Sequence, residues 1–322
     1  MLDKNKNSLE VGEIKVVTFD VGGTLAKGGF KKKLYRSKVA SYLQRQGFDV
    51  TSDDYWRATG KALEELNRRR EDQLEMGFED FCSTIIRNLG ITPSEELLGG
   101  IRSLYFKCFP QIERRGVRKV LVRLSRAYEL GVISNSMSLL PKRFLEESEL
   151  ARYFKAIVIS GEVGYRKPHP EIFKRALEKF EANPEEVVHV GNSLEEDVVG
   201  AKGVGMYSVL VSPQVIEEAQ VGPDLAVPSI GEVPGAIESL AFPRLREFKE
   251  LLGNRCGFCS ARGVNLYKID PKGGEDIDNY VLLCSSCRRE TLKKRIPRPR
   301  KHGKYRAIYR RAWLELHKPK RV

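Results

Sequence analysis

The sequence predicts an α/β protein: a doubly wound, parallel, Rossmann-like sheet with an inserted helical cap, followed by a small C-terminal zinc-binding ββα module and a basic helical tail. Short apolar runs alternate with amphipathic helical patterns through most of the chain, which is typical of a parallel sheet covered by helices. Two closely spaced cysteine pairs stand near the C-terminus, and many basic residues follow them. The 322 residues, 41% of them hydrophobic, are enough for more than one folded unit.

The first predicted strand covers residues 14–19, IKVVTF, an apolar β-branched run that stops at a glycine-rich turn. Later runs of the same character are also predicted strands, at residues 128–133, 156–159, 187–190 and 207–211. Amphipathic helical patterns separate them at residues 117–127, 170–180 and 193–205. Because the carboxyl ends of parallel strands share one edge of the sheet, the ligand crevice is expected at that edge.

The segment between the first two strands is too long for a loop in a compact sheet and is expected to fold by itself. Helical patterns fill it, and Cys82 and Cys108 stand at apolar positions of these patterns, which predicts that both are buried. The expected domains are therefore a core formed by residues 13–25 and 117–242, and a helical cap formed by residues 26–116.

Polar groups follow the predicted strands in a regular order. The sequence has Asp20, Gly22 and Thr24 in VVTFDVGGTL, Ser134 and Asn135 in GVISNS, Lys167 in GYRKPHPEIF, and Asn192 and Asp197 in VGNSLEEDVVGA. An aspartate or a serine after a strand is by itself typical of a turn. The joint order of these groups and their placement at strand ends favour a shared site.

These four motifs resemble those of the haloacid dehalogenase-like hydrolase superfamily, over the predicted core and its cap. The resemblance implies that Asp20 is a nucleophile that attacks phosphorus or carbon and forms a covalent aspartyl intermediate. It also implies that Ser134 holds a phosphoryl oxygen, and that Lys167 offsets the charge of the nucleophile and of the transferred group. Thr24 and Asn135 are expected to contact the substrate. In the family, the inserted helical cap covers the crevice and selects the substrate, here expected to be a small phosphorylated molecule.

The same resemblance implies a magnesium ion bound by Asp20, the backbone carbonyl of Gly22, Asn192 and Asp197. Many relatives have an aspartate where this chain has Asn192, so the site has one anionic ligand fewer, although the amide oxygen can still coordinate magnesium. Glu196 is a candidate for an additional ligand.

The sequence departs from the family at Gly22, where relatives have a second aspartate that protonates the leaving group. Glycine cannot give a proton, and general acid assistance is worth about 10²–10⁴-fold in rate. Three interpretations stay open. In the first, the leaving group needs no proton, as in an acyl phosphate. In the second, the protein is a dehalogenase whose halide lies near an arginine, for which Arg36, Arg45 and Arg57 are candidates. In the third, it is a catalytically silent adaptor.

Two CxxC pairs with 24 residues between them have the spacing of a structural zinc site. Their cysteines are Cys256, Cys259, Cys284 and Cys287. Disulfides are the alternative, but a bridge within CxxC is strained. Residues 253–292, preceded by a linker at 243–252, resemble the zinc-bearing ββα core of HNH nucleases. Tyr267 and Lys268 replace the catalytic histidines of that family, so the zinc module is expected to bind rather than to cleave.

The net charge of the chain is concentrated in its last residues. Residues 288–322 contain 15 Lys+Arg and 2 Asp+Glu, and the difference of 13 equals the net charge of +13 of the whole chain. The end of the zinc module and the basic tail at 293–322 are therefore expected to bind RNA or DNA, with an acidic protein as the alternative. The expected contacts are Arg288, Arg289, Lys293, Lys294, Arg295, Arg298, Arg300, Lys301, Arg306, Arg310 and Arg311.

The sequence also bears on the location of the protein. No apolar run approaches the about 18 residues that a membrane-spanning helix needs. The chain starts with MLDKNKNSLE, which lacks an apolar leader. A cytoplasmic protein without membrane contact is expected, while its natural substrate and oligomeric state stay open.

Overall fold

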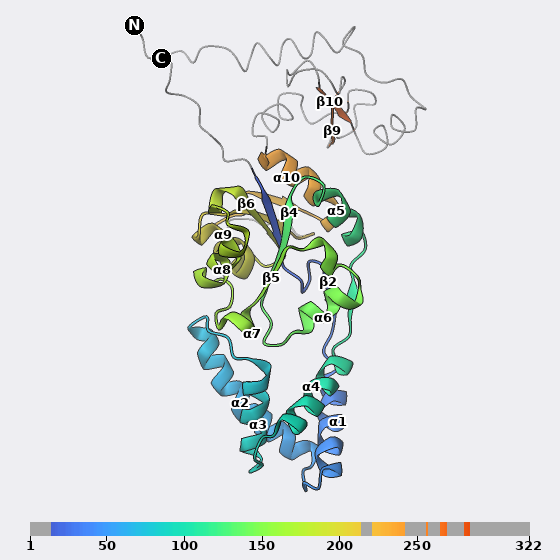
Figure 1. Ribbon diagram of the computed structural model, residues 1–322, viewed down its shortest axis with the longest axis vertical. Helices are drawn as coiled ribbons and strands as arrows, with labels where there is room; N and C mark the ends of the chain where they lie inside the picture. The colour runs from blue at the N-terminus through green and yellow to red at the C-terminus, as the bar shows by residue number, and fades with distance from the viewer. Residues whose placement is uncertain (1–13, 214–220, 242–255, 257–264, 269–279, 284–322) are drawn as a thin grey trace. The chain divides into compact units, whose positions relative to one another are not determined.

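The computed structural model describes residues 14–213, 221–241, 256, 265–268 and 280–283 of the chain (Figure 1). Contacts divide the chain into two compact units, Met1–Ala236 and Ile237–Val322. The first unit contains the parallel sheet and the helical insertion. None of the described helices is both long enough and apolar enough to cross a membrane.

The first unit is built on a six-stranded sheet with the strand order β5-β4-β1-β6-β7-β8. Its strands are β1 (Val16–Phe19), β4 (Glu129–Ser134), β5 (Ala156–Ile159), β6 (Val187–Gly191), β7 (Tyr207–Val211) and β8 (Leu225–Val227). All neighbours in this sheet pair in parallel. Every residue of β1 is buried because this strand lies in the middle, between β4 and β6, which explains its continuous apolar run. The predicted parallel α/β fold is confirmed.

Helices cover both faces of this sheet. They are α5 (Val117–Leu124), α6 (Leu140–Glu147), α7 (Ser160–Val163), α8 (Pro170–Phe180) and α9 (Gly200–Gly203), and α10 (Val233–Ala241) follows β8. Figure 1 shows α8 and α9 against one face of the sheet and α5 against the other, as right-handed crossovers in opposite directions require. The apolar side of α8, with Ile172, Phe173, Ala176 and Phe180, is buried in the core cluster that includes Val16 of β1 and Ile133 of β4.

The helical pattern predicted at residues 193–205 begins as a π-helical turn, Leu194–Val199, and continues as α9. The side chain of Ser193 accepts a hydrogen bond from the backbone N–H of Glu196 and so caps the turn. Turns of this type are rare and occur often at functional sites. Here the turn carries Asp197, whose carboxylate accepts hydrogen bonds from the backbone at the start of the turn.

Four helices form the insertion between β1 and β4: α1 (Lys32–Arg45), α2 (Ser52–Glu71), α3 (Phe78–Asn88) and α4 (Glu95–Cys108). A two-stranded antiparallel ribbon of β2 (Ala26–Gly28) and β3 (Gln111–Glu113) joins the two ends of the insertion. The start of α2 is fixed by a capping box, in which Thr51 and Asp54 each accept a hydrogen bond from the backbone of the other. The assignment of residues 26–116 as a cap domain stays a prediction, because the contacts place the insertion and the sheet in the same unit.

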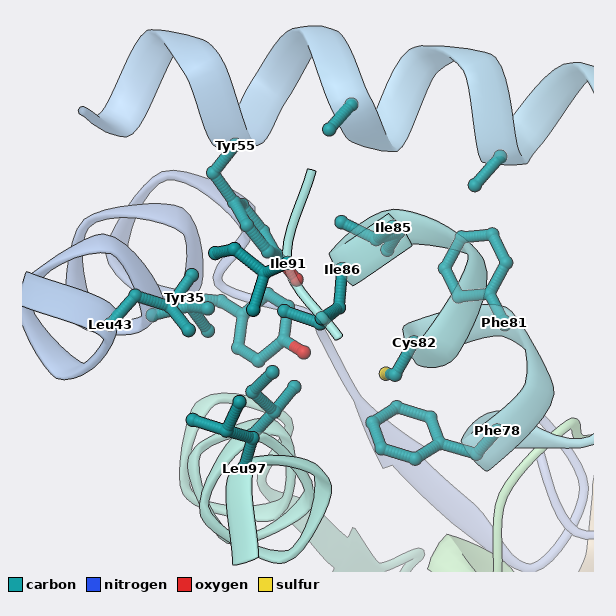
Figure 2. Packing of buried hydrophobic residues seen from close by; sticks show 14 of the residues in the cluster. Tyr35, Leu43, Tyr55, Phe78, Phe81, Cys82, Ile85, Ile86, Ile91 and Leu97 are labelled. Atoms are coloured by element: carbon teal, nitrogen blue, oxygen red, sulfur yellow. The ribbon is translucent and has the colours of Figure 1, made fainter. Parts of the chain in front are cut away.

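The insertion has a hydrophobic core of its own. On α2 the buried residues Tyr55, Ala58, Ala62 and Leu66 recur every three or four residues and form one apolar face. Figure 2 shows this face packed against Cys82, Ile85 and other residues of the remaining helices. Cys82 and Cys108 are both buried, as the sequence predicted.

The second unit contains one described pair of strands, β9 (Asn265–Lys268) and β10 (Tyr280–Leu283), which pair antiparallel. Cys256, Val281 and Leu283 are buried. The other three cysteines of the predicted zinc site, the linker and all the predicted nucleic-acid contacts lie outside the described residues. The zinc module and the basic tail therefore stay predictions.

Candidate active site

The carboxyl ends of β1, β4 and β6 bring the predicted motifs together around one lysine. Lys167 lies in the loop between α7 and α8, and its ammonium group donates to three oxygen atoms. Its Nζ lies 2.9 Å from Oδ1 of Asp20, 2.5 Å from Oδ1 of Asp197 and 2.8 Å from the backbone oxygen of Ile133. Because an ammonium group has three N–H donors, these contacts satisfy it completely.

This cluster is buried, and burial changes its protonation. The side chain of Lys167 is fully buried, and those of Asp20 and Asp197 are 10% and 4% exposed. Burial raises the pKa of Asp20 to about 6, although Lys167 acts in the opposite direction. Burial would lower the pKa of Lys167, but the carboxylates of Asp197 and Asp20 outweigh it and raise that pKa above its ordinary value. Lys167 is therefore a permanent cation beside a carboxylate that ionises near neutral pH.

Asp197 uses all its acceptor positions inside the protein. Its Oδ1 accepts from Lys167 and lies 3.2 Å from Nε2 of His189, and its Oδ2 accepts from the backbone N–H groups of Asn192 and Ser193 at 2.9 and 2.8 Å. Burial opposes ionisation, but Lys167 and His189 hold the pKa of Asp197 well below its ordinary value. A carboxylate has about four acceptor positions. None is left for a metal in this arrangement, and the role of Asp197 as a magnesium ligand remains a prediction.

Gly191 lets this carboxylate approach the strand. A Cβ atom added at Gly191 would lie 2.1 Å from the carboxyl carbon of Asp197. Any side chain at this position would therefore push Asp197 away from Lys167 and from the backbone donors of the loop. The glycine of the VGNS motif is required by this close approach.

Asn135 and Thr24, the predicted substrate contacts, both hold neighbouring parts of the site. The side chain of Asn135 donates to the backbone oxygen of Lys167 at 3.0 Å and accepts from its backbone N–H at 2.7 Å. The hydroxyl group of Thr24 donates to Oδ1 of Asn192 at 3.0 Å. Asn135 thus fixes the loop that carries the lysine, while Thr24 fixes the side chain of Asn192.

A cavity of about 430 Å³ opens beside this cluster. Gly22, Ser134 and Asn135 line it from the sheet side, together with the start of α6, and residues of α1 to α4, β3 and the adjoining loops of the insertion also line it. Of the arginines considered for a halide site, Arg36 lines the cavity, whereas Arg45 and Arg57 are not among its described lining residues. Around Gly22 no atom lies within 4 Å of the place where a Cβ would stand, so the position of the missing general acid is open space.

The oxygen atoms predicted to bind magnesium are of the chemical types that this ion takes. Asp20 supplies one carboxylate, and the amide oxygen of Asn192 and the carbonyl of Gly22 belong to the adjoining loops. Magnesium commonly uses one or two carboxylates together with water and substrate phosphate oxygens. The magnesium ligand set of Asp20, Gly22, Asn192 and Asp197 stays a prediction. Among the described residues there is no cluster of three His, Cys, Asp or Glu side chains that could hold a metal.

Two residues that contact the site, His189 and Glu75, were not identified from the sequence. His189 lies inside β6 and contacts Asp197 with one ring nitrogen and Thr18 with the other, at 3.0 Å; burial lowers its pKa, so the ring is neutral. Glu75, 1% exposed, accepts from Arg70 at 3.0 Å and from the hydroxyl group of Ser160 at 3.2 Å. Glu75 thereby connects the end of α2 to the sheet side of the site. The only signal in the sequence was a histidine within the otherwise apolar run VVHVG.

Glu196, the candidate for an additional magnesium ligand, has a different partner. Its Oε1 lies 2.8 Å from Nη2 of Arg166, the residue before Lys167. Arg166 also lies 3.7 Å from Glu75. Glu196 therefore belongs to the ion-pair network around the lysine loop.

Several known proteins are similar to this chain. A family model described as "Hydrolase: haloacid dehalogenase-like hydrolase" matches residues 14–205. A glyceraldehyde 3-phosphate phosphatase of Pyrococcus furiosus is 29% identical over 199 residues, which are 61% of this chain and 80% of that protein. A phosphoserine phosphatase of Thermus thermophilus is 37% identical over 109 residues, which are 34% of this chain and 44% of that protein.

Among solved structures, a 2-haloacid dehalogenase of Pseudomonas syringae is similar with a TM-score of 0.55. The match has 21% sequence identity and covers 70% of this chain and 98% of that one, so it supports the fold alone. The family model covers more than half of the chain. The chain therefore belongs to the haloacid dehalogenase-like hydrolase family.

Proposed function

We propose that this protein is a hydrolase that removes a phosphoryl group from a small organic molecule through Asp20, and that the leaving group of its substrate departs without being protonated. The observation that carries the proposal is the pairing of Asp20 with the buried cation of Lys167, next to a cavity in which Gly22 offers no acid. The phosphatases among the relatives support phosphoryl chemistry. Acyl phosphates and phosphoanhydrides have suitable leaving groups.

In the first step an oxygen atom of Asp20 attacks phosphorus, and the bond from phosphorus to the leaving oxygen breaks. The electron pair stays on the leaving group, which for an acyl phosphate becomes a stable carboxylate. Ser134, at the end of β4 and on the cavity wall, donates a hydrogen bond to a phosphoryl oxygen, while Lys167 keeps Asp20 ionised. Water then attacks phosphorus, the bond to Asp20 breaks with its electron pair returning to the carboxylate, and the proton of the water leaves with the inorganic phosphate. Magnesium, held by Asp20, Gly22 and Asn192, would offset the charge of the phosphoryl group.

The first experiment compares acetyl phosphate with ethyl phosphate, two substrates of similar size with a good and a poor leaving group. With magnesium present, we expect kcat/KM for acetyl phosphate to exceed that for ethyl phosphate by at least about 10²-fold, because no group protonates an alkoxide. The Asp20→Asn variant should turn over neither substrate above background. Asp80→Asn, which changes an exposed aspartate, is the matched control and should keep full activity. Equal activity of wild type and Asp20→Asn would contradict the proposal.

Carbon–halogen hydrolysis is the second candidate. It is favoured by Arg36 on the cavity wall and by the lack of a second aspartate at Gly22. Chloride release from 2-chloropropionate that needs Asp20 but no magnesium, in the absence of acetyl phosphate turnover, would make this candidate the better one.

For the second unit we propose a zinc site at the four cysteines and nucleic-acid binding by the basic tail. Buried Cys256 and the antiparallel pair of β9 and β10, which lies between the two cysteine pairs, support the zinc site. Metal analysis of the purified chain should find about one zinc per molecule. Cys284→Ser should lose most of it, while Cys82→Ser, in the core of the insertion, should keep it. Zinc retained in Cys284→Ser would contradict the site.

The tail is tested by truncation after Cys287. Binding to RNA or DNA should weaken steeply with salt and should be lost with residues 288–322, because phosphate contacts release counterions. Unchanged binding by the truncated chain would exclude the tail as the contact surface. Tail-dependent binding together with an inactive Asp20 would favour the adaptor.

A further inference from the structure

The cavity beside Asp20 is larger and more apolar than a short polar phosphate requires. A volume of about 430 Å³ lies in the range of sites for drug-sized ligands. Apart from the loops that follow β1 and β4, its wall consists largely of aromatic and aliphatic side chains of the insertion. A triose or a serine side chain would leave most of this surface uncovered. Water in contact with such a wall is readily displaced by an apolar group of the substrate.

Aromatic rings give this wall a fixed shape. Phe30 lies 5.1 Å from Tyr35 and 5.4 Å from Phe109, and Phe78 lies 4.6 Å from Tyr105, measured between ring centroids. Figure 2 shows Tyr35 and Tyr55 extending from their helices into one cluster. The rings of these two tyrosines meet edge to face, with 6.3 Å between their centroids. Ring carbon atoms therefore make up much of this wall.

The outer part of the wall is also apolar. Trp56 and Leu63, both on α2 and both lining the cavity, are 51% and 36% exposed. The guanidinium group of Arg36 lies 5.5 Å from the ring centre of Trp56 and is held by hydrogen bonding to Ser52. An apolar group of the substrate would cover the tryptophan and the leucine, while the positive charge of Arg36 beside them is paired with Asp53 at 3.3 Å.

One polar atom on the wall has no partner in the described part of the chain. The side-chain oxygen Oε1 of Gln111, on β3, is buried and accepts no hydrogen bond there. A buried acceptor without a donor is unfavourable. Since Gln111 lines the same cavity, a rotation of its side-chain amide would bring this oxygen to a hydroxyl or amino group of a ligand.

We infer that the substrate is a phosphorylated compound with an aromatic or medium-length aliphatic group that carries a hydroxyl or amino substituent, the apolar group lying against the aromatic wall and the substituent donating to Gln111. This inference rests on the proposed function and names its substrate class. Aroyl and longer acyl phosphates that carry a hydroxyl or amino substituent belong to this class, and their leaving carboxylate needs no proton.

Binding is tested first, with ligands that cannot react. Benzylphosphonate and methylphosphonate share the phosphonate group and differ in the ring. With magnesium present, titration followed by the fluorescence of Trp56 should give a Kd about 10–100-fold lower for benzylphosphonate. Trp56→Phe removes the reporter and shows how much signal comes from Trp313. Equal affinities for the two ligands would overturn the inference.

Turnover is tested with acetyl, butanoyl and hexanoyl phosphate. We expect kcat/KM to rise about fourfold for each added methylene that becomes buried. Among the hydroxybenzoyl phosphates, one isomer should exceed benzoyl phosphate in kcat/KM by about 2–10-fold, and in Gln111→Leu the ratio of these two kcat/KM values should fall to about one. A preference that survives in Gln111→Leu would overturn the role of this residue.

The two proposals fail differently. Asp20-dependent turnover of acetyl phosphate without any gain from longer or aromatic groups would overturn the substrate class and leave the proposed function standing. Tight binding of benzylphosphonate without turnover of any acyl phosphate would overturn the proposed function, while the preference of the cavity for apolar groups would stand.

Discussion

Replacing Gly22 with aspartate is expected to raise the rate of leaving-group release from benzyl phosphate by about 10²–10⁴-fold. The alkoxide of benzyl alcohol needs a proton as it departs, and wild-type protein has no acid at this position. The substitution is sterically possible, because Gly22 lines the cavity, has no atom within 4 Å of the place of an added Cβ, and is not among the glycines with positive φ. The new carboxyl group would lie at the cavity, on the residue two positions after the nucleophile Asp20.

The measurement is the release of benzyl alcohol in the first turnover, with enzyme in excess. Because benzyl alcohol is released before the aspartyl phosphate is hydrolysed, this measurement does not depend on the hydrolysis step. A carboxylate at position 22 would also assist that later step. Benzoyl phosphate is the matched substrate, and its first turnover should change by less than about tenfold, since a carboxylate leaves without a proton. Gly22→Asn is the matched variant of similar size and should not accelerate benzyl phosphate. An equal gain for both substrates, or for both variants, would contradict the account of Gly22.

The fold could be predicted because its central elements have strong local patterns. The run IKVVTF has the composition of a strand buried on both faces, and β1 is such a strand. β8 was missed because it has three residues, one of them exposed, which is too short for a pattern. The ribbon of β2 and β3 was missed for the same reason. Both short elements depend on pairing with partners that lie far away in the sequence.

The cluster of Asp20, Lys167 and Asp197 could be predicted from the order of the motifs, because all parallel strands deliver their carboxyl ends to one edge. Which hydrogen-bond donor each carboxylate oxygen accepts from could not be predicted. Asp197 meets both Lys167 and a pair of backbone donors only because the π-helical turn brings it back to the loop after β6. Glu75 meets Ser160 over a separation of 85 residues, and no local pattern encodes such a contact.

The residues that line the cavity could not be predicted from the sequence for a related reason. Aromatic residues at helical spacing read as core, and Tyr35 and Tyr55 are indeed core residues of the insertion. That the same rings also line a cavity beside Gly22 follows from how the insertion is placed over the loops of the sheet. The orphan acceptor of Gln111 likewise becomes visible only when all its neighbours are known.

Removing the ammonium group of Lys167 by substitution with methionine is expected to lower the free energy of unfolding by about 3–5 kcal/mol near neutral pH, because two buried carboxylates lose the cation between them. Lys155→Met is the matched control. Lys155 pairs with Glu129 at 2.8 Å, a distance similar to the 2.9 Å between Lys167 and Asp20, but both partners are 48% exposed. Its loss should change stability by about 0–1 kcal/mol.

The pH dependence of this loss has a definite sign. Without Lys167 the pKa of Asp20 rises above the value of about 6 in the wild type, because burial and the charge of Asp197 are no longer opposed. A folded-state pKa above that of the unfolded chain means that the folded protein binds more protons, so stability rises as pH falls. The deficit of Lys167→Met should therefore be smaller near about pH 5 than near about pH 8.

Urea unfolding followed by Trp56 fluorescence, in a Trp313→Phe background at both pH values, measures this difference. Any residual turnover by Lys167→Met should require a higher pH than the wild type, because Asp20 must be ionised to attack. A deficit equal to that of Lys155→Met, or one that grows as the pH falls, would show that Lys167 does not balance the two carboxylates. Lys167 would then have to act on the substrate alone, although all three of its donors are used within the protein.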